Sequence, residues 1–325
     1  MSARTGGAPA TLEAEVRPPS PFRIGRGSTD RTLRVDRGIA TRLLQVDCRP
    51  VLVRAWQPGP GRVKFRAEAV DPTRLTVPPV CDELLPAGRE ELATAIERMR
   101  FALGVDEDMS AFHQRFRRDP LVGPIIRRMP DYRPSRRIWP WEALAAAVCG
   151  QLIEASRAAV IERRIVGRWG ARLGEGRGAL RDVPAPAVIA GRAPAELQSM
   201  DLSGARSVAL RKLAIAVSRG HGDIASPESN ARFLAIPEIG PWTIQCLALF
   251  GRGEADSLPA GDLGYIKLVG HLANLGRRAT VPEVEEFYAP YEPYRGLVGS
   301  LTLSGLHRVV AEGPKLRLAP GSLAA

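Results

Sequence analysis

The apolar residues of this chain change their spacing once, close to residue 88, and this change most constrains the fold. Before it, the segments 31–36, 43–47, 51–56 and 63–67 are short, rich in β-branched or aromatic residues, and separated by turn-forming residues. Such segments are typical of antiparallel strands. After it, apolar residues recur every three or four positions, as on one face of a helix. The sequence therefore predicts an α+β fold, mainly α with an N-terminal antiparallel β domain.

We expect three parts along the 325 residues, a length that exceeds one typical domain. Residues 1–20 are dominated by Gly, Ala, Pro, Ser and Thr and are predicted to be a disordered tail. Residues 21–87 form the β-rich domain, and residues 88–325 form a helical body. Helices are expected at 90–103, 109–116, 121–129, 141–169 with a break near Gly150, 185–198, 204–218, 228–235, 241–250, 263–275 and within 281–310.

The formal net charge of +11 favours a polyanionic partner such as nucleic acid, although an Arg-rich composition alone produces the same charge. No apolar run approaches the roughly 20 residues of a membrane span. The N-terminal segment also lacks the pattern of a secretory signal. We therefore expect a cytoplasmic protein with no membrane partner.

The four cysteines, at positions 48, 81, 149 and 246, are far apart, and none belongs to a C-x-x-C pair. Zinc and iron–sulfur sites need clustered ligands, so no metal site is expected. Four reduced thiols are predicted, because a disulfide framework is disfavoured in a chain of this size without an export signal. No cofactor is expected, and a monovalent cation at the hairpin described next is the one ion left open.

Residues 228–251 contain a tight turn between two helical segments. The first helix ends near Ala235, Ile236-Pro-Glu-Ile-Gly240 forms the turn, and Pro241 begins the second helix. Pro237 stops the first helix, Gly240 is predicted to adopt a conformation that a Cβ would resist, and Ile239 can fill the gap between the helices. Free backbone N–H groups at the second helix can hold a DNA phosphate. From the pentapeptide alone, an ordinary helix–turn–helix corner is an equally good interpretation.

This stretch resembles the hairpin of the helix-hairpin-helix DNA glycosylase superfamily, whose usual turn is L-P-G-I-G. Residues 256–267, Asp-Ser-Leu-Pro-Ala-Gly-Asp-Leu-Gly-Tyr-Ile-Lys, resemble the F-P-x-x-D-L-G segment of the bacterial 3-methyladenine DNA glycosylase II (AlkA) type. Residues 140–152 and 292–295 resemble two further segments of that family, and the resemblance covers about residues 95–310. It implies an enzyme of base excision repair that hydrolyses the N-glycosidic bond of damaged bases, above all alkylated purines, in double-stranded DNA. It also implies a monomer associated with the bacterial nucleoid.

By this resemblance, the catalytic carboxylate is Asp262. An anion beside the sugar stabilises the positive charge that develops there during hydrolysis, and it can also orient or deprotonate water. Asp262 lies at the expected N-cap of the helix that begins at Leu263, and a helix N-terminus favours the ionised form. The alternative is that Asp262 is only an N-cap. Asp256, the competing carboxylate, matches a structural loop position of the family.

Bifunctional members of the superfamily use a Lys two residues after the second Gly of the hairpin, and this Lys forms a Schiff base with the sugar. Trp242 occupies that position here. The resemblance therefore predicts a monofunctional enzyme that leaves an abasic site without cutting the strand.

The resemblance also assigns residues that contact the base and the DNA. The base pocket is expected to be lined by Trp242, Cys246, Tyr265 and Leu303, where Cys246 and Leu303 replace common aromatic residues. The wedge that fills the space of the extruded base maps to Gln151 and Leu152, with core packing as the alternative for Leu152. Contacts to the DNA backbone are assigned to Ile236, Pro237, Glu238, Ile239, Gly240 and Thr243, where Glu238 replaces the usual first Gly.

Two other functions remain open from the sequence. One is a binding protein that grips DNA or lesions without catalysis, which Glu238 and the less aromatic pocket favour and Asp262 argues against. The other is a glycosylase for oxidised or deaminated bases.

Overall fold

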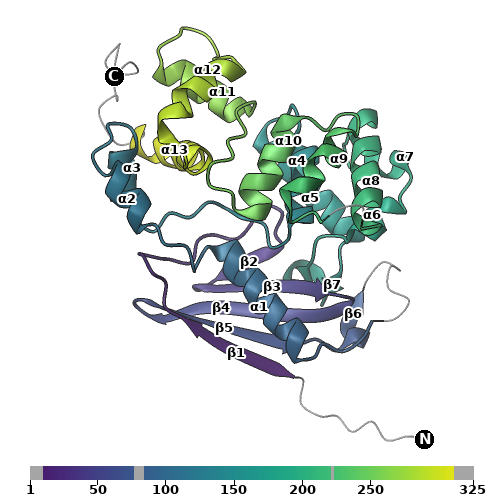
Figure 1. Ribbon diagram of the computed structural model, residues 1–325. Helices are drawn as coiled ribbons and strands as arrows, with labels where there is room; N and C mark the ends of the chain where they lie inside the picture. The colour runs from purple at the N-terminus through teal and green to yellow at the C-terminus, as the bar shows by residue number, and fades with distance from the viewer. Residues whose placement is uncertain (1–9, 77–83, 221–222, 311–325) are drawn as a thin grey trace, which may run out of the picture.

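The N-terminal strands form one antiparallel sheet beneath a helical body (Figure 1). The structure, a computed structural model, describes residues 10–76, 84–220 and 223–310. The sheet has the order β1-β5-β4-β3-β2, which confirms the predicted antiparallel arrangement. Its strands are β1 (Thr11–Val16), β2 (Leu33–Asp36), β3 (Ile39–Val46), β4 (Arg49–Gly59) and β5 (Arg62–Ala69).

Strand β1 corrects the prediction of a disordered tail over residues 1–20. Residues 11–16 pair antiparallel with β5 along its whole length, while residues 1–9 lie outside the described residues. The apolar residues of β1 are half-buried and alternate with exposed acidic residues, of which Glu13 lies 3.7 Å from Arg66 on β5. The alternation of a strand is present in Thr-Leu-Glu-Ala-Glu-Val, but the Gly- and Pro-rich residues around it hide the pattern.

Helix α1 (Arg89–Leu103) packs across the sheet, although the predicted boundary at 87/88 placed it in the helical body. Its buried residues Leu92, Ala95, Ile96 and Met99 lie on one face and share a core with the strands. The N-terminal core therefore extends through α1.

The helical body follows the predicted order with two differences in its boundaries. The predicted helix 185–198 divides in two because Pro194 has no N–H and begins a new helix, and the predicted helix 263–275 ends at Leu272. The helices are α2 (Ser110–Phe116), α3 (Val122–Arg128), α4 (Pro140–Gly150), α5 (Ala155–Trp169), α6 (Pro186–Ala190), α7 (Pro194–Gln198), α8 (Gly204–Ser218), α9 (Asn230–Leu234), α10 (Pro241–Cys246), α11 (Leu263–Leu272), α12 (Val281–Tyr288) and α13 (Arg295–Val310).

Short elements complete the fold. A π-helical segment, Leu247–Arg252, continues α10. A second sheet of order β6-β7-β8, which the sequence did not predict, joins Leu75–Thr76, Arg172–Leu173 and Leu180–Arg181. Single 3-10 turns lie at Pro72–Arg74, Gly176–Gly178, Pro227–Ser229 and Ala289–Tyr291.

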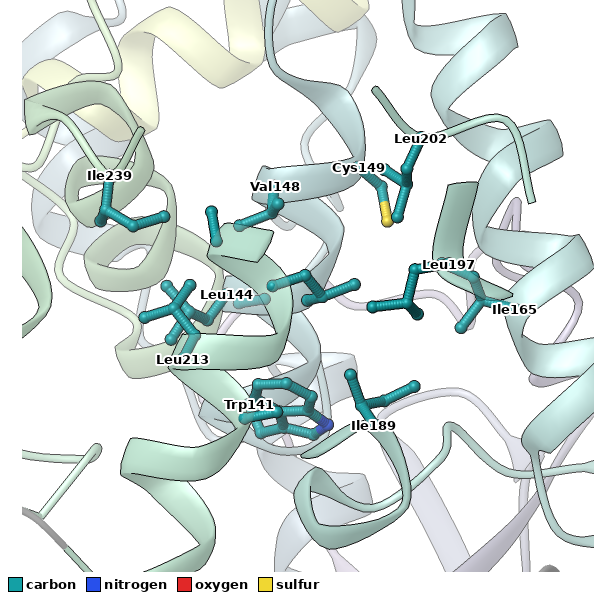
Figure 2. Close-up of a cluster of buried hydrophobic side chains, with 14 of the residues drawn as sticks. Trp141, Leu144, Val148, Cys149, Ile165, Ile189, Leu197, Leu202, Leu213 and Ile239 are labelled. Carbon is teal, nitrogen blue, oxygen red and sulfur yellow. The ribbon is translucent and has the colours of Figure 1, made fainter. Parts of the chain in front are cut away.

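Two apolar clusters divide the helical body into two halves, which lie side by side above the sheet (Figure 1). The first half is built on α4, α5, α8 and the turn after α9, with Trp141, Leu144 and Leu213 at its centre (Figure 2). The second half contains α2, α3, α11, α12 and α13. The connection from α10 to α11 passes between the halves and carries Asp262.

A buried ionic network holds the β-rich part to the first half of the body. Arg42 of β3 donates to Glu142 of α4 at 2.7 Å and to Asp182 at 3.0 Å, with 3% of its own side chain exposed. Arg137 likewise pairs with Asp30 and with Glu162 of α5. Two guanidinium groups thus face four carboxylates. Because burial disfavours the charged form, the pKa of Glu142 is raised to about 7.

The cysteines differ from the prediction of four reduced thiols. Cys149 and Cys246 are free and buried, whereas Cys48 is disulfide-bonded. The prediction is wrong for Cys48 because separation along the chain does not reveal which side chains meet in space. None of the helices within the described ranges combines the length and the apolar character needed to cross a bilayer.

Candidate active site

The turn between α9 and α10 has the predicted hairpin form. Ile239 is 5% exposed, and its side chain points into the first apolar cluster together with Leu144 and Leu213 (Figure 2), which confirms its predicted role between the helices. Its backbone N–H donates to the carbonyl of Ile236 at 3.1 Å. Across the described chain, the N–H groups of Gly240 and Trp242 find no acceptor. The start of α10 therefore offers free donors beside a rigid turn.

The strained position in this turn is Glu238, not Gly240. Glu238 has a φ of 72°, in the left-handed region that favours glycine. Gly240 is extended, with φ −105° and ψ 179°, and an added Cβ would meet no atom within 4 Å. The prediction for Gly240 is therefore wrong. The residue that replaces the family's first Gly adopts the backbone conformation that a Gly would adopt freely.

The six hairpin residues assigned to the DNA backbone differ in exposure. Pro237 and Glu238 are exposed, while Ile236 and Gly240 are half-buried. Thr243 is 1% exposed, and its hydroxyl accepts a hydrogen bond from Gln151 at 3.1 Å. The Thr243 side chain thus supports the hairpin from inside, which corrects its assignment as a DNA contact.

The predicted wedge lies at the end of α4, next to the hairpin. Leu152 is 93% exposed and has a φ of 58°, so the alternative of core packing is wrong. The Gln151 side chain donates to the carbonyl of Glu238 at 2.7 Å, which ties this loop to the hairpin. Arg206 of α8, which sequence reasoning did not single out for this role, donates to the carbonyls of Cys149 at 3.1 Å and Gln151 at 3.4 Å. An exposed Leu is therefore held on a braced loop.

Asp262 forms the N-cap of α11, where its Oδ1 accepts a hydrogen bond from the N–H of Gly264 at 2.7 Å. The carboxylate is half-buried. Burial raises its pKa above the ordinary range, and the hydrogen bond from Gly264 opposes this only in part. The expectation that the helix N-terminus dominates is therefore corrected, because the loss of water outweighs it.

Asp256, the competing carboxylate, has a different environment. Its side chain accepts hydrogen bonds from the backbone N–H of Arg295 at 3.1 Å and from Arg295 Nε at 2.9 Å. These hydrogen bonds lower the pKa of Asp256 against the opposing effect of burial. Asp256 therefore anchors the start of α13, as its match to a structural loop position implied.

Trp242 and Leu303 lie against the segment that carries Asp262. A Cβ added at Gly261 would lie 3.6 Å from Trp242 Cδ1, and a Cβ added at Gly264 would lie 3.1 Å from Leu303 Cδ2. Among the described residues, the buried indole Nε1 of Trp242 has no hydrogen-bond partner. The aromatic ring and the carboxylate thus belong to one site.

Cys246 and Tyr265 lie beneath this site and not on its surface. Their side chains are buried, at 6% and 2% exposure, and the Tyr265 ring packs edge-on against Tyr288 with centroids 5.8 Å apart. Burial raises the pKa of the Cys246 thiol, and the nearby Asp262 carboxylate raises it further. Neither side chain is open to solvent, and their place in the base pocket stays a prediction.

One further contact at the site was not predicted. Lys267 Nζ of α11 lies 2.5 Å from Oε1 of Glu154. Glu154 follows Leu152 by two positions. The two residues are 113 positions apart, so no spacing in the sequence could have paired them.

The turn between α9 and α10, the exposed Leu152 and the N-cap Asp262 lie at the positions where the resemblance predicted the hairpin, the wedge and the catalytic aspartate of a DNA glycosylase. No family model matches the chain. The chain is 28% identical over 207 residues to the probable bifunctional transcriptional activator/DNA repair enzyme AlkA of Mycobacterium tuberculosis. That alignment covers 63% of this chain and 42% of the relative, which is less than half the relative's length.

Solved structures share the fold over almost the whole chain. The 3-methyladenine DNA glycosylase of Archaeoglobus fulgidus superposes with a TM-score of 0.73, at 16% identity, over 91% of this chain and 98% of that one. The 8-oxoguanine glycosylase/lyase of Clostridium acetobutylicum superposes with a TM-score of 0.61, at 13% identity, over 92% and 99%. The predicted resemblance to helix-hairpin-helix DNA glycosylases, of the AlkA type, and the predicted fold class are therefore confirmed.

Proposed function

We propose that this protein is a monofunctional DNA glycosylase that hydrolyses the N-glycosidic bond of alkylated purines in double-stranded DNA. One observation carries the proposal: a half-buried carboxylate, Asp262, directly follows Gly261, which packs against the ring of Trp242 after the hairpin. A non-catalytic DNA-binding protein has no need to withdraw a carboxylate from water, since that burial is unfavourable.

The chemistry follows from the positions of these residues. The hairpin N–H groups of Gly240 and Trp242 hold a phosphate, and the exposed Leu152 fills the space that the extruded base leaves. Ionised Asp262 then stabilises the positive charge that develops on the deoxyribose, and its raised pKa makes it a better base toward water. The electron-rich face of Trp242 favours a cationic alkylated base over a neutral one.

The lack of strand cleavage is the second part of the proposal. Trp242 occupies the position of the family's amine nucleophile, and an indole cannot form a Schiff base. Lys267 Nζ, whose charge acts on Asp262, is paired with Glu154. The fold itself is compatible with lyase chemistry, since a glycosylase/lyase shares it.

The proposed reaction is tested with duplex oligonucleotides that carry one methylated purine, one 8-oxoguanine or one deaminated base. We expect release of the free methylated purine and an abasic strand that breaks only after alkali treatment. Borohydride added during the reaction should trap no covalent adduct. Binding without release of any base would support the binding-protein alternative, and a trapped adduct would refute the monofunctional assignment.

Replacing Glu238 by Gly is expected to increase both stability and DNA affinity. The Gly relieves a left-handed conformation that costs a larger residue about 1–2 kcal/mol, and its greater freedom when unfolded offsets part of this. We expect a net gain of about 0.5 kcal/mol in the free energy of unfolding, measured by denaturant titration. Affinity for duplex DNA should rise because a negative charge leaves the phosphate site.

Glu238→Ala is the matched control, because it removes the charge and keeps the strained φ. It should gain DNA affinity without the gain in stability. If neither variant binds duplex DNA more tightly than the native protein, the hairpin does not approach a phosphate.

A further inference from the structure

The ion pair between Glu154 and Lys267 joins the two halves of the helical body beside Asp262. Glu154 is the N-cap of α5 and Lys267 lies on α11, with 66% and 45% of their side chains exposed. Both charges act on the catalytic carboxylate, since Glu154 raises the pKa of Asp262 and Lys267 lowers it. The pair therefore lies near the proposed path of an extruded nucleotide and is open to solvent.

A basic hollow continues from Lys267 along the turn between α11 and α12. Its volume is about 340 Å³, and Lys267, His271, Asn274 and Arg278 line it together with Arg277. Arg277 is engaged by Glu283 of α12 at 2.7 Å. None of the described residues that line the hollow is acidic. Arg278 is close enough to Glu154 to lower the pKa of that carboxyl group, although the Lys267 hydrogen bond lowers it most.

We propose that this hollow binds the DNA backbone next to the extruded nucleotide, with Lys267 exchanging Glu154 for a phosphate when DNA binds. The inference rests on the proposed function, because it needs a nucleotide that reaches Asp262. Phosphate oxygens accept charge-assisted hydrogen bonds from ammonium and guanidinium groups, and the hollow presents both. In the free protein, Glu154 pairs with Lys267. When DNA binds, the phosphate takes the place of Glu154, whose negative charge repels it.

A merely structural ion pair predicts something different. An exposed pair of this kind contributes about 0–1 kcal/mol to stability, and loss of either partner removes the same contact. If the pair stays closed on DNA, Lys267 makes no phosphate contact, and both variants should keep the native dependence of affinity on salt. A partner exchange instead requires opposite effects on affinity and a weaker salt dependence for the Lys267 variant, because Glu154 competes with the phosphate and Lys267 binds it.

The test compares Lys267→Met and Glu154→Gln in binding to an undamaged duplex at several salt concentrations. We expect Lys267→Met to weaken binding several-fold, and to reduce the slope of log affinity against log salt concentration by about 0.9. Glu154→Gln should tighten binding. In the pH profile of base release, Glu154→Gln should move the acid limb to lower pH, and Lys267→Met should move it to higher pH.

Two controls complete the experiment. Arg278→Met, in the hollow, should weaken binding with a reduced salt slope, whereas Arg54→Met, on β4 of the sheet, should leave binding unchanged. Base release by the native protein is measured in parallel. Suppose that the native protein releases base. If both single variants then shift affinity in the same direction, or if Lys267→Met keeps the native salt slope, the inference is wrong and the proposed function still stands. If the native protein neither binds duplex DNA nor releases base, the proposed function fails, and the inference fails with it.

Discussion

Replacing Asp262 by Asn is expected to lower base release by about 10³-fold while duplex binding is kept. The amide still caps α11 by accepting from Gly264, but it carries no charge to stabilise the sugar. In the native protein, burial raises the pKa of Asp262. The pKa that sets the acid limb of the kcat/KM profile should therefore lie above that of an ordinary aspartate. Single-turnover base release across pH measures both effects.

The same substitution should stabilise the fold at neutral pH. The pKa of Asp262 is higher in the folded state than in the unfolded state, so its ionisation on folding is unfavourable, and stability falls as pH rises through the interval between the two values. Asp262→Asn should therefore have a higher Tm than the native protein at pH 7, and the difference should vanish in strong acid. Asp256→Asn is the control, because it should lose stability through Arg295 and keep most of the activity. Full base release by Asp262→Asn would refute the catalytic role.

The second large effect is expected from Arg42→Met. This substitution leaves Glu142 and Asp182 buried without their cation, which typically costs about 3–5 kcal/mol in the free energy of unfolding. For a chain of this size we expect the Tm to fall by about 10 °C. Arg54→Met, which breaks the half-exposed pair with Glu68, should change stability by less than about 1 kcal/mol.

The ionic network also predicts how stability changes with pH. Burial raises the pKa of Glu142 from 4.5 to about 7 in the folded state, so the folded state binds more protons than the unfolded state between these values. Stability should therefore decline as pH rises from about 4.5 to about 7. Thermal unfolding at pH 5.5 and pH 8 tests this, with Glu142→Gln as the matched variant that keeps the hydrogen-bond acceptor. If the Tm of Glu142→Gln depends on pH as strongly as that of the native protein, another titratable group causes the effect.

The sequence was sufficient for the parts of the fold that depend on local patterns. The alternation in 63–67, the helical spacing in α1 and the Pro-Gly turn before α10 all predicted their elements. Strand β1 is not predicted, because its short alternating pattern lies within a Gly- and Pro-rich segment whose composition is typical of disorder. The candidate site was predicted from the same kind of information, because Asp262 and Leu152 lie within recognisable segments of the chain.

The properties that depend on tertiary contacts could not be predicted. The burial of Tyr265 depends on which face of α11 meets the second apolar cluster, and that of Cys246 depends on which face of α10 turns inward. The left-handed conformation of Glu238 depends on the backbone of the whole turn, whereas a sequence pattern points to Gly240 as the residue that would adopt it. Arg42 lies on a strand whose alternation gives no sign that its charge is buried against α4.

The hydrogen bond from Gln151 to the carbonyl of Glu238 has a consequence for how such a protein would search a genome. Because the loop that carries Leu152 is hydrogen-bonded to the turn that we propose binds a DNA phosphate, the two proposed contacts with DNA would form together. Whenever the turn binds the backbone of a duplex, the exposed Leu152 would then lie against the stacked bases. Each binding event on undamaged DNA would therefore also test how firmly the local bases are stacked, and weakly stacked nucleotides would be extruded most readily.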